Sequence, residues 1–199
     1  MAAFLAVTVG VETGRFTAID TAGIHLARAL PAPTLVLPAL QAASFLAAGA
    51  AIPIALGIAL YLGARGRRPT AWFYAATCLS GWAAELLIKE IVRHPRPIGI
   101  SPKLTAAGWY SYPSGHAMLS VLVFGLGVDL LTRGTTRGIR TLALAAAVAL
   151  IAAVGLSRVY LGAHWPSDVV GALLAGVAWT AGAVAFYEPS PSAPPYTVA

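Results

Sequence analysis

Hydrophobic residues fill long stretches of the chain, and polar residues are gathered in short clusters between them. An apolar stretch of roughly 20 residues is long enough to cross a bilayer as a helix. Such stretches predict membrane spans within residues 33–63, 70–92, 114–132, 141–157 and 166–187. We therefore expect an all-α, polytopic membrane helical bundle.

Neither residues 1–30 nor residues 188–199 contain an apolar stretch long enough for a full span. Residues 1–11 are apolar but short, so we expect a partial first span or a surface anchor, which would complete a six-helix core. Residues 17–30 mix apolar and charged positions and predict an amphipathic surface helix. In that helix, Thr17 and Asp20 have the spacing of a capping box. One membrane-embedded domain is expected up to residue 187, followed by a disordered, Pro- and Ser-rich tail over 188–199.

Composition agrees with a membrane protein and argues against a nucleic-acid-binding one. Of all residues, 58% are hydrophobic and only 10% are charged, whereas soluble domains carry about 25% charged residues. The net charge of +6 comes from short basic clusters and not from a continuous stripe, so no nucleic-acid partner is expected. Cys78 lies in an apolar run and is expected to be a small buried residue.

Arginines predict how the chain is oriented in the membrane. The short Arg-rich loops 65–68 and 133–140 should face the cytoplasm, because basic loops are retained on that side. Three polar segments, residues 89–97, 113–116 and 157–168, then fall together at the extracytoplasmic face. Polar groups beside a bilayer are costly to place and usually have a function. We interpret the three segments as one site that binds and cleaves a phosphate ester.

The first two segments offer cations and the start of a helix. Arg96 lies between two prolines, whose stiff backbone would aim its guanidinium at phosphate, and Lys89 adds a second cation. The alternative is a basic cluster that only contacts lipid headgroups. Ser114 is placed as the N-cap of the next helix, so the backbone N–H groups of Gly115 and His116 could bind an anion. Ordinary interfacial residues are expected at Arg93, His94 and Lys103.

The third segment is the most specific. Asp168 falls in the first turn of a helix that begins at Pro166, and His164 lies just before that helix. A carboxylate that holds one imidazole N–H leaves the other ring nitrogen free to attack, and Arg158 would add positive charge beside it. The alternative is an aspartate that only caps its own helix. No cluster has the spacing of metal ligands, so we expect no metal or cofactor, and charge stabilisation from cations and N–H groups.

Two histidines would divide the chemistry. His164 would attack phosphorus and form a phosphohistidine. His116 would protonate the departing oxygen and then activate water. Glu85, one turn before Lys89, could hold that lysine in an ion pair or could be a packing carboxylate. Asp129 is expected to reach the inner interface.

The combined pattern Lys-x6-Arg-Pro, Pro-Ser-Gly-His and Ser-Arg-x5-His-x3-Asp resembles the type-2 phosphatidic acid phosphatase family, over roughly residues 70–187. That family also contains vanadium haloperoxidases and glucose-6-phosphatases. The matching positions are Lys89, Arg96, Pro97, Pro113, Ser114, Gly115, His116, Ser157, Arg158, His164 and Asp168. The resemblance implies a six-helix α-helical core, a phosphohistidine mechanism without metal, and lipid phosphates or diphosphates as substrates.

The expected function is therefore a multi-pass cell-membrane phosphatase that acts on a lipid phosphate at the extracytoplasmic face. An undecaprenyl-type diphosphate is the favoured substrate, and phosphatidylglycerophosphate or phosphatidic acid fits almost as well. A phosphotransferase would use the same site, and a vanadate-dependent haloperoxidase would hold vanadate in it. A transporter is disfavoured because no unpaired charge lies at the middle of a span. The sequence does not indicate an oligomeric state.

Overall fold

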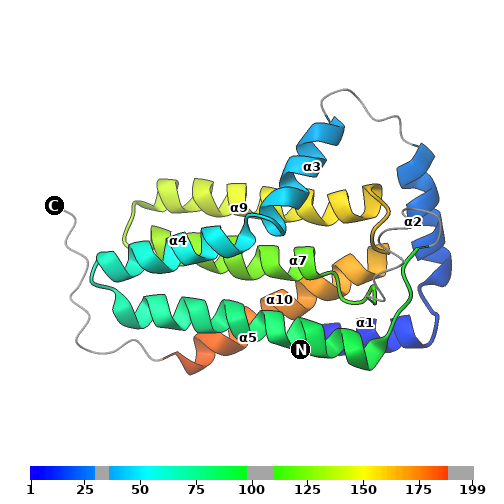
Figure 1. Cartoon of the computed structure of the whole chain (residues 1–199), viewed down its shortest axis with the longest axis horizontal. Helices are drawn as coiled ribbons and strands as arrows, with labels where there is room; N and C mark the ends of the chain where they lie inside the picture. The colour runs from blue at the N-terminus through cyan, green and yellow to red at the C-terminus, as the bar shows by residue number, and fades with distance from the viewer. Residues whose placement is uncertain (30–35, 98–109, 188–199) are drawn as a thin grey trace.

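The structure is a computed structural model, and it describes residues 1–29, 36–97 and 110–187. Every regular element of these residues is helical, which confirms the predicted all-α class. The expected disordered tail and Lys103 lie outside the described residues. The elements, shown in Figure 1, are α1 (Ala2–Glu12), α2 (Thr17–Ala29), α3 (Val36–Ala47), α4 (Ala51–Ala64), α5 (Arg68–Val92), α7 (Gly115–Ser120), η1 (Val121–Leu126), α8 (Gly127–Thr132), α9 (Arg137–Tyr160) and α10 (Pro166–Phe186).

Four of the predicted spans are continuous helical runs. These are α5, the run from α7 through η1 to α8, α9 and α10, and each is long and apolar enough to cross a membrane. Their bounds lie within a few residues of those predicted from the sequence. The chain is therefore a multi-pass membrane protein.

The predicted span over residues 33–63 is a bent pair of helices and not one continuous helix. This stretch forms two helices, α3 and α4, which are bent by 57° at the break between them. The break contains Gly49, which lies against the ring of Phe45 in the preceding turn. A hydropathy average depends on which residues are apolar and not on the direction of the helix axis. The bend therefore could not be predicted from hydropathy. The helices α1 and α2 form a second bent pair at 88°, and the described residues have six spans if each pair counts as one.

The core lies where the run from α7 to α8 passes between α5, α9 and α10. The middle of that run, η1, is a π-helix. Two side chains of α5 donate hydrogen bonds to its carbonyls: Tyr74 to Val123 at 3.1 Å, and the buried Cys78 to Leu122 at 3.7 Å. Groups that bond to helix carbonyls from outside accompany such local widening. These contacts fix the position of α7 along the axis of α5. They therefore also fix the position of the first residues of α7.

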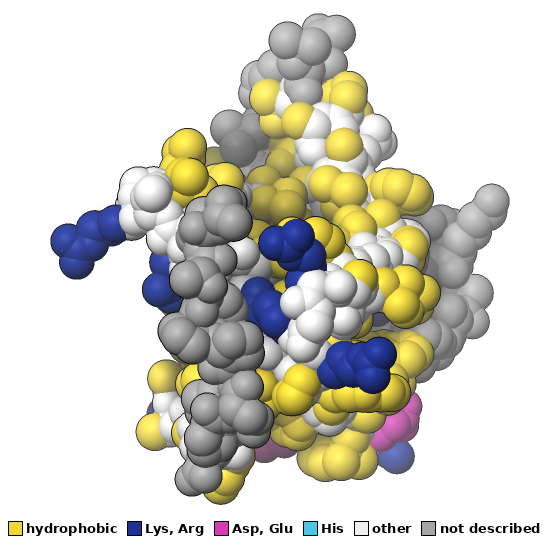
Figure 2. Space-filling model, turned by 90° about the vertical axis from the view of Figure 1, so that its left-hand side faces the viewer, with side chains coloured by type: hydrophobic (Ala, Val, Ile, Leu, Met, Phe, Trp, Pro, Cys, Tyr) yellow, Lys and Arg dark blue, Asp and Glu magenta, His cyan; other side chains and the backbone are white. Residues whose placement is uncertain are grey.

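The two ends of the bundle differ in chemistry. The basic turns 65–68 and 133–136 lie together at one end, and Figure 2 looks onto that end, where Lys and Arg side chains stand among apolar ones. Asp129 reaches this end as expected, with its oxygens 2.6 Å from Arg133 and 2.6 Å from Arg140. The end of α5, the starts of α7 and α10 and the end of α9 lie at the opposite end, beside α2 (Figure 1).

Helix α2 lies across this opposite end. Ile24 is buried against the bundle, whereas Ile19 and Leu26 are exposed. The predicted capping box is wrong. The Thr17 hydroxyl donates to the carbonyl of Gly14 at 2.9 Å, and the Asp20 carboxylate turns away from its own helix towards α10.

Candidate active site

The first polar segment leaves α5 as the sequence predicts. The helix ends at Val92, and Arg93 takes a left-handed backbone conformation with φ 52°, which turns the chain into residues 94–97. Arg96 then points back towards the bundle. Its guanidinium donates to the carbonyls of Ala163 at 2.7 Å and Tyr110 at 3.4 Å. Burial lowers the pKa of Arg96, but an arginine remains a cation at any physiological pH.

Lys89 is buried near the end of α5 and holds the segment that leads into α7. Its ammonium lies 3.0 Å from Glu85, so of the two alternatives for this carboxylate the ion pair is the one formed. It also donates to the carbonyls of Pro113 at 2.5 Å and Tyr110 at 3.2 Å. These three partners occupy the three ammonium protons. Lys89 therefore fixes the approach to α7 in addition to placing a positive charge at this end of the bundle.

The second segment begins α7 with unusual polar groups. Ser114 is the N-cap residue, but its hydroxyl makes no capping hydrogen bond, contrary to expectation, because Lys89 and a backbone contact hold this turn instead. That contact is the N–H of Ser114 donating to the Asp168 carbonyl at 3.2 Å. The hydroxyl is buried without a partner among the described residues. A side chain at Gly115 would meet Glu85 at 2.8 Å, so this backbone lies directly on the Glu85–Lys89 pair.

The turn after α9 joins Arg158 to His164. Gly162 has φ 64° and occupies the left-handed position of a Schellman motif. Its N–H donates to the Val159 carbonyl, and the N–H of Ala163 donates to the Arg158 carbonyl, both at 2.9 Å. The N–H of His164 also donates to the Arg158 carbonyl, at 3.2 Å. The position of His164 is therefore set by the way in which α9 ends.

The Arg158 side chain is buried and only partly satisfied. Its Nη1 donates to the hydroxyl of Ser44 on α3, and its Nε has no partner in the described part of the chain. Buried donors are costly unless they are hydrogen-bonded. The Nε of Arg158 and the hydroxyl of Ser114 are therefore donors available to a ligand. The cations whose charges act on His116 are Arg158, Arg96 and Lys89.

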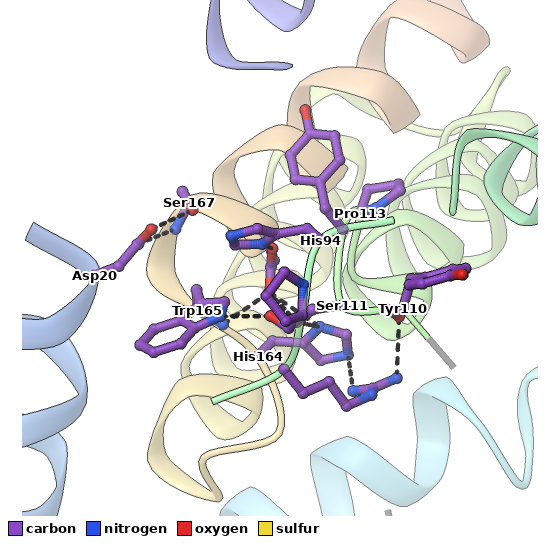
Figure 3. Close-up of polar contacts among 12 residues, drawn as sticks. Asp20, His94, Tyr110, Ser111, Pro113, His164, Trp165 and Ser167 are labelled. Atoms are coloured by element: carbon purple, nitrogen blue, oxygen red, sulfur yellow. Dashed lines mark hydrogen bonds and ion pairs between the residues drawn. The ribbon is translucent and has the colours of Figure 1, made fainter. Parts of the chain in front are cut away.

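A fully buried carboxylate, that of Asp168, joins the segments. Figure 3 shows its partners His94, Ser111 and Trp165. One oxygen accepts the N–H of Trp165 at 2.8 Å and the hydroxyl of Ser111. The other oxygen lies 3.0 Å from Nδ1 of His94. Nδ1 of His164 is farther away, 3.5 Å from the carboxylate and 3.4 Å from the Ser111 oxygen. Asp168 thus reaches His164 largely through Ser111, and its nearer imidazole is that of His94.

Two residues of this cluster were missed in the sequence. His94 was expected to be an ordinary interfacial residue, and Ser111 was not identified at all. They lie 74 and 57 positions from Asp168 in the chain, so no local pattern connects them to it. The one available signal was their place, since each lies one or two residues before a proline between two spans.

His164 is oriented from both sides. Its Nε2 lies 3.3 Å from the Arg96 guanidinium, which can only donate, so Nε2 is the acceptor and Nδ1 carries the proton towards Ser111 and Asp168. Burial lowers the pKa of His164 to about 4, so the imidazole is neutral near pH 7. A neutral imidazole with its lone pair turned towards a cation is arranged to attack an anionic group bound at that cation.

Comparisons with known proteins identify the family and the fold of the chain. A family model described as the PAP2 superfamily matches residues 69–191, which contain all three polar segments. The fold is similar to the crystal structure of a transmembrane PAP2-type phosphatidylglycerolphosphate phosphatase from Bacillus subtilis, with a TM-score of 0.80 and 20% sequence identity. That similarity covers 92% of this chain and 91% of the other. No curated protein sequence matches the chain.

The lowered pKa of His164 predicts how the imidazole and the fold respond to acid. In substrate-free protein labelled with ¹⁵N-histidine, the signal that is lost in His164→Gln should titrate near pH 4, and not near the ordinary value of about 6.5. Between these pH values the unfolded chain binds the proton and the folded protein does not. Stability should therefore fall as the pH drops from about 6.5 towards 4. A titration midpoint near 6.5 would contradict the buried, neutral imidazole.

Proposed function

Because the chain belongs to the PAP2 superfamily, we propose that it is an integral membrane phosphatase that removes phosphate from a lipid through a covalent intermediate on His164. The observation that carries the proposal is the orientation of the His164 ring. Its Nδ1 faces Ser111 and Asp168, and its Nε2 faces Arg96 at 3.3 Å. The nitrogen that we propose as the nucleophile therefore lies against the cation that would hold the phosphoryl group.

The groups around this nitrogen suit a phosphate ester, which carries close to two negative charges near neutral pH. Arg96 and Arg158 would bind its oxygens, and the buried charge of Lys89 would add to the positive field. The hydroxyl of Ser114 and the N–H groups at the start of α7, including that of Gly115, would donate further hydrogen bonds. The free Nε of Arg158 and hydroxyl of Ser114 fit this role, because each is a buried donor with no acceptor among the described residues.

The reaction would proceed in two steps. Nε2 of His164 attacks phosphorus, the bond from phosphorus to the lipid oxygen breaks, and the Nδ1 proton stays in place. The imidazole ring then carries a positive charge, and the negative charge of Asp168 stabilises this phosphoimidazolium. The side chain of His116 makes no hydrogen bond with the described residues, so its ring nitrogens remain available. We assign it the proton transfer to the departing lipid oxygen and the activation of water in the second step.

The proposed chemistry uses the chain's own cations in place of a metal ion. Groups of three or more His, Cys, Asp or Glu suited to a metal are lacking in the described parts of the chain. Its carboxylates are instead engaged with protein groups: Glu85 with Lys89, and Asp168 with His94, Ser111 and Trp165. These pairs leave Arg96 and Arg158 to balance the charge of the phosphate.

The proposed substrate is a lipid phosphate presented at the extracytoplasmic face of the cell membrane. The site lies at the end of the bundle opposite the Arg-rich turns 65–68 and 133–136, and such turns favour the cytoplasmic side. We favour a polyprenyl diphosphate such as undecaprenyl diphosphate. A phosphatidylglycerophosphate is the second candidate, because the Bacillus subtilis protein with the same fold is a phosphatidylglycerolphosphate phosphatase.

The direct test measures phosphate release by the purified protein in detergent from three lipids: undecaprenyl diphosphate, phosphatidylglycerophosphate and phosphatidic acid. Release should persist in a chelator, and rapid quenching should trap an acid-labile phosphoprotein. His164→Ala should lose both, with turnover reduced on the order of 10⁴-fold or more. Turnover that disappears with the chelator and returns only with a divalent cation would contradict the proposed mechanism.

The role of His116 makes a separate prediction about the leaving group. His116→Ala should reduce hydrolysis of an alkyl phosphate by about 10²- to 10⁴-fold, because an alkoxide needs a proton to depart. The loss on p-nitrophenyl phosphate should be much smaller, because nitrophenolate leaves without protonation. Both rates are measured at saturating substrate on the same preparation. Equal losses on the two substrates would show that His116 does not protonate the leaving group.

A further inference from the structure

A carboxylate from the N-terminal part of the chain reaches the first turn of α10, as Figure 3 shows for Asp20 and Ser167. Asp20 belongs to α2 and is only 5% exposed. One of its oxygens accepts the backbone N–H of Ser167 at 2.8 Å, and the other accepts the Ser167 hydroxyl at 2.6 Å. Ser167 is the residue directly before Asp168, so the contact lies next to the carboxylate that organises the site.

Two carboxylates therefore hold the beginning of α10. The first N–H groups of a helix have no partner within the helix, and buried ones need an acceptor from elsewhere. Pro166 has no N–H. The N–H of Trp165 donates to Asp168, and that of Ser167 donates to Asp20. Negative charge at this end is also favoured by the helix dipole. Loss of Asp20 would leave the N–H of Ser167, in the turn that carries Asp168, without its acceptor.

The packing of α2 keeps Asp20 in this position. One turn after Asp20, a side chain on Gly23 would meet Cγ of Pro166 at 2.6 Å, so the backbone of α2 lies directly against the first residue of α10. Ile24 is buried on the same side of α2. A bulkier residue at position 23 would push α2 away, which indicates that close approach of the two helices is built into the sequence.

We propose that Asp20 is a positioning residue of the active site. By holding Ser167, it fixes the adjacent Asp168, and through Asp168 and Ser111 it maintains the orientation of the His164 ring. Asp20 touches neither His164 nor the reacting atoms. It precedes residues 69–191, which the family model matches, so membership of the family does not assign it this role. The inference rests on the proposed function of His164.

The first test compares kinetic constants of four variants in detergent, with a lipid phosphate that the wild-type protein hydrolyses. Asp20→Ala removes both acceptors and should lower kcat about tenfold to a hundredfold with little change in KM, since small misplacements of a reacting group cost that much. Asp20→Asn keeps an oxygen for the Ser167 N–H and should recover most of the rate. Ser167→Ala loses the hydroxyl contact alone and should show a small decrease. The matched control is Thr21→Ala, whose exposed hydroxyl bonds only within α2, and it should behave as wild type.

The second test does not depend on hydrolysis. The ¹⁵N chemical shifts of His164 distinguish the two neutral tautomers, and wild-type protein should show the Nδ1–H form. Asp20→Ala should shift the signal towards a mixture of tautomers, and Asp20→Asn should restore it. If Asp20→Ala does not fold, the positioning role is tested instead with Asp20→Asn and Ser167→Ala. Their kcat values and their His164 tautomers are compared with those of wild type.

The outcomes separate the two proposals. A wild-type protein that releases no phosphate from any lipid phosphate overturns the proposed function, and the His164 signal still tests the role of Asp20. Unchanged kcat in Asp20→Ala, or a decrease that follows a lower unfolding temperature while the His164 tautomer stays as in wild type, overturns the positioning role.

Discussion

The buried carboxylate of Asp168 is the constraint on which the rest of this structure depends. A carboxylate without access to water is costly unless each oxygen accepts hydrogen bonds. Asp168 obtains them from the turn after α5, from the segment before α7 and from its own helix start, through His94, Ser111 and the Trp165 N–H. Its backbone carbonyl adds the N–H of Ser114. The helix ends that carry the site must therefore meet at this one group, which is why the chemistry sits at one end of the bundle.

The basic residues at this end serve different purposes. The ammonium of Lys89, on a flexible side chain, is occupied by Glu85 and by backbone carbonyls. Lys89 therefore holds the loop before α7 in place. Arg96 and Arg158 have planar guanidinium groups, whose several N–H donors can bind protein and ligand at the same time. Arg96 ties the segment after α5 to the turn after α9, through Ala163 and His164, and Arg158 ties α9 to α3 through Ser44. Each cation stabilises the architecture and contributes positive charge to the same small volume.

Much of this could be predicted from the sequence, because spans, basic loops and proline turns are local patterns. The ends of α5 and α10 and the Glu85–Lys89 pair follow from spacing within one helix. What could not be predicted depends on contacts across the bundle. The bend between α3 and α4 leaves hydropathy unchanged, and Ser111 gains its importance only from a residue 57 positions away. Asp20 has the spacing of a local cap, but its acceptors are taken by Ser167, 147 positions later. The hydrogen bonds to Ser167 thus replace the local capping contact that the spacing of Thr17 and Asp20 favours.

The substitution Asp168→Asn tests the central claim most directly, because it keeps the shape of the side chain and removes its charge. The variant should have the elution volume and the helical content of the wild-type protein. His164 should no longer be in the Nδ1–H tautomer, and no acid-labile phosphoprotein should form on rapid quenching. A folded Asp168→Asn protein that phosphorylates at the wild-type rate, with the His164 tautomer unchanged, would contradict the account.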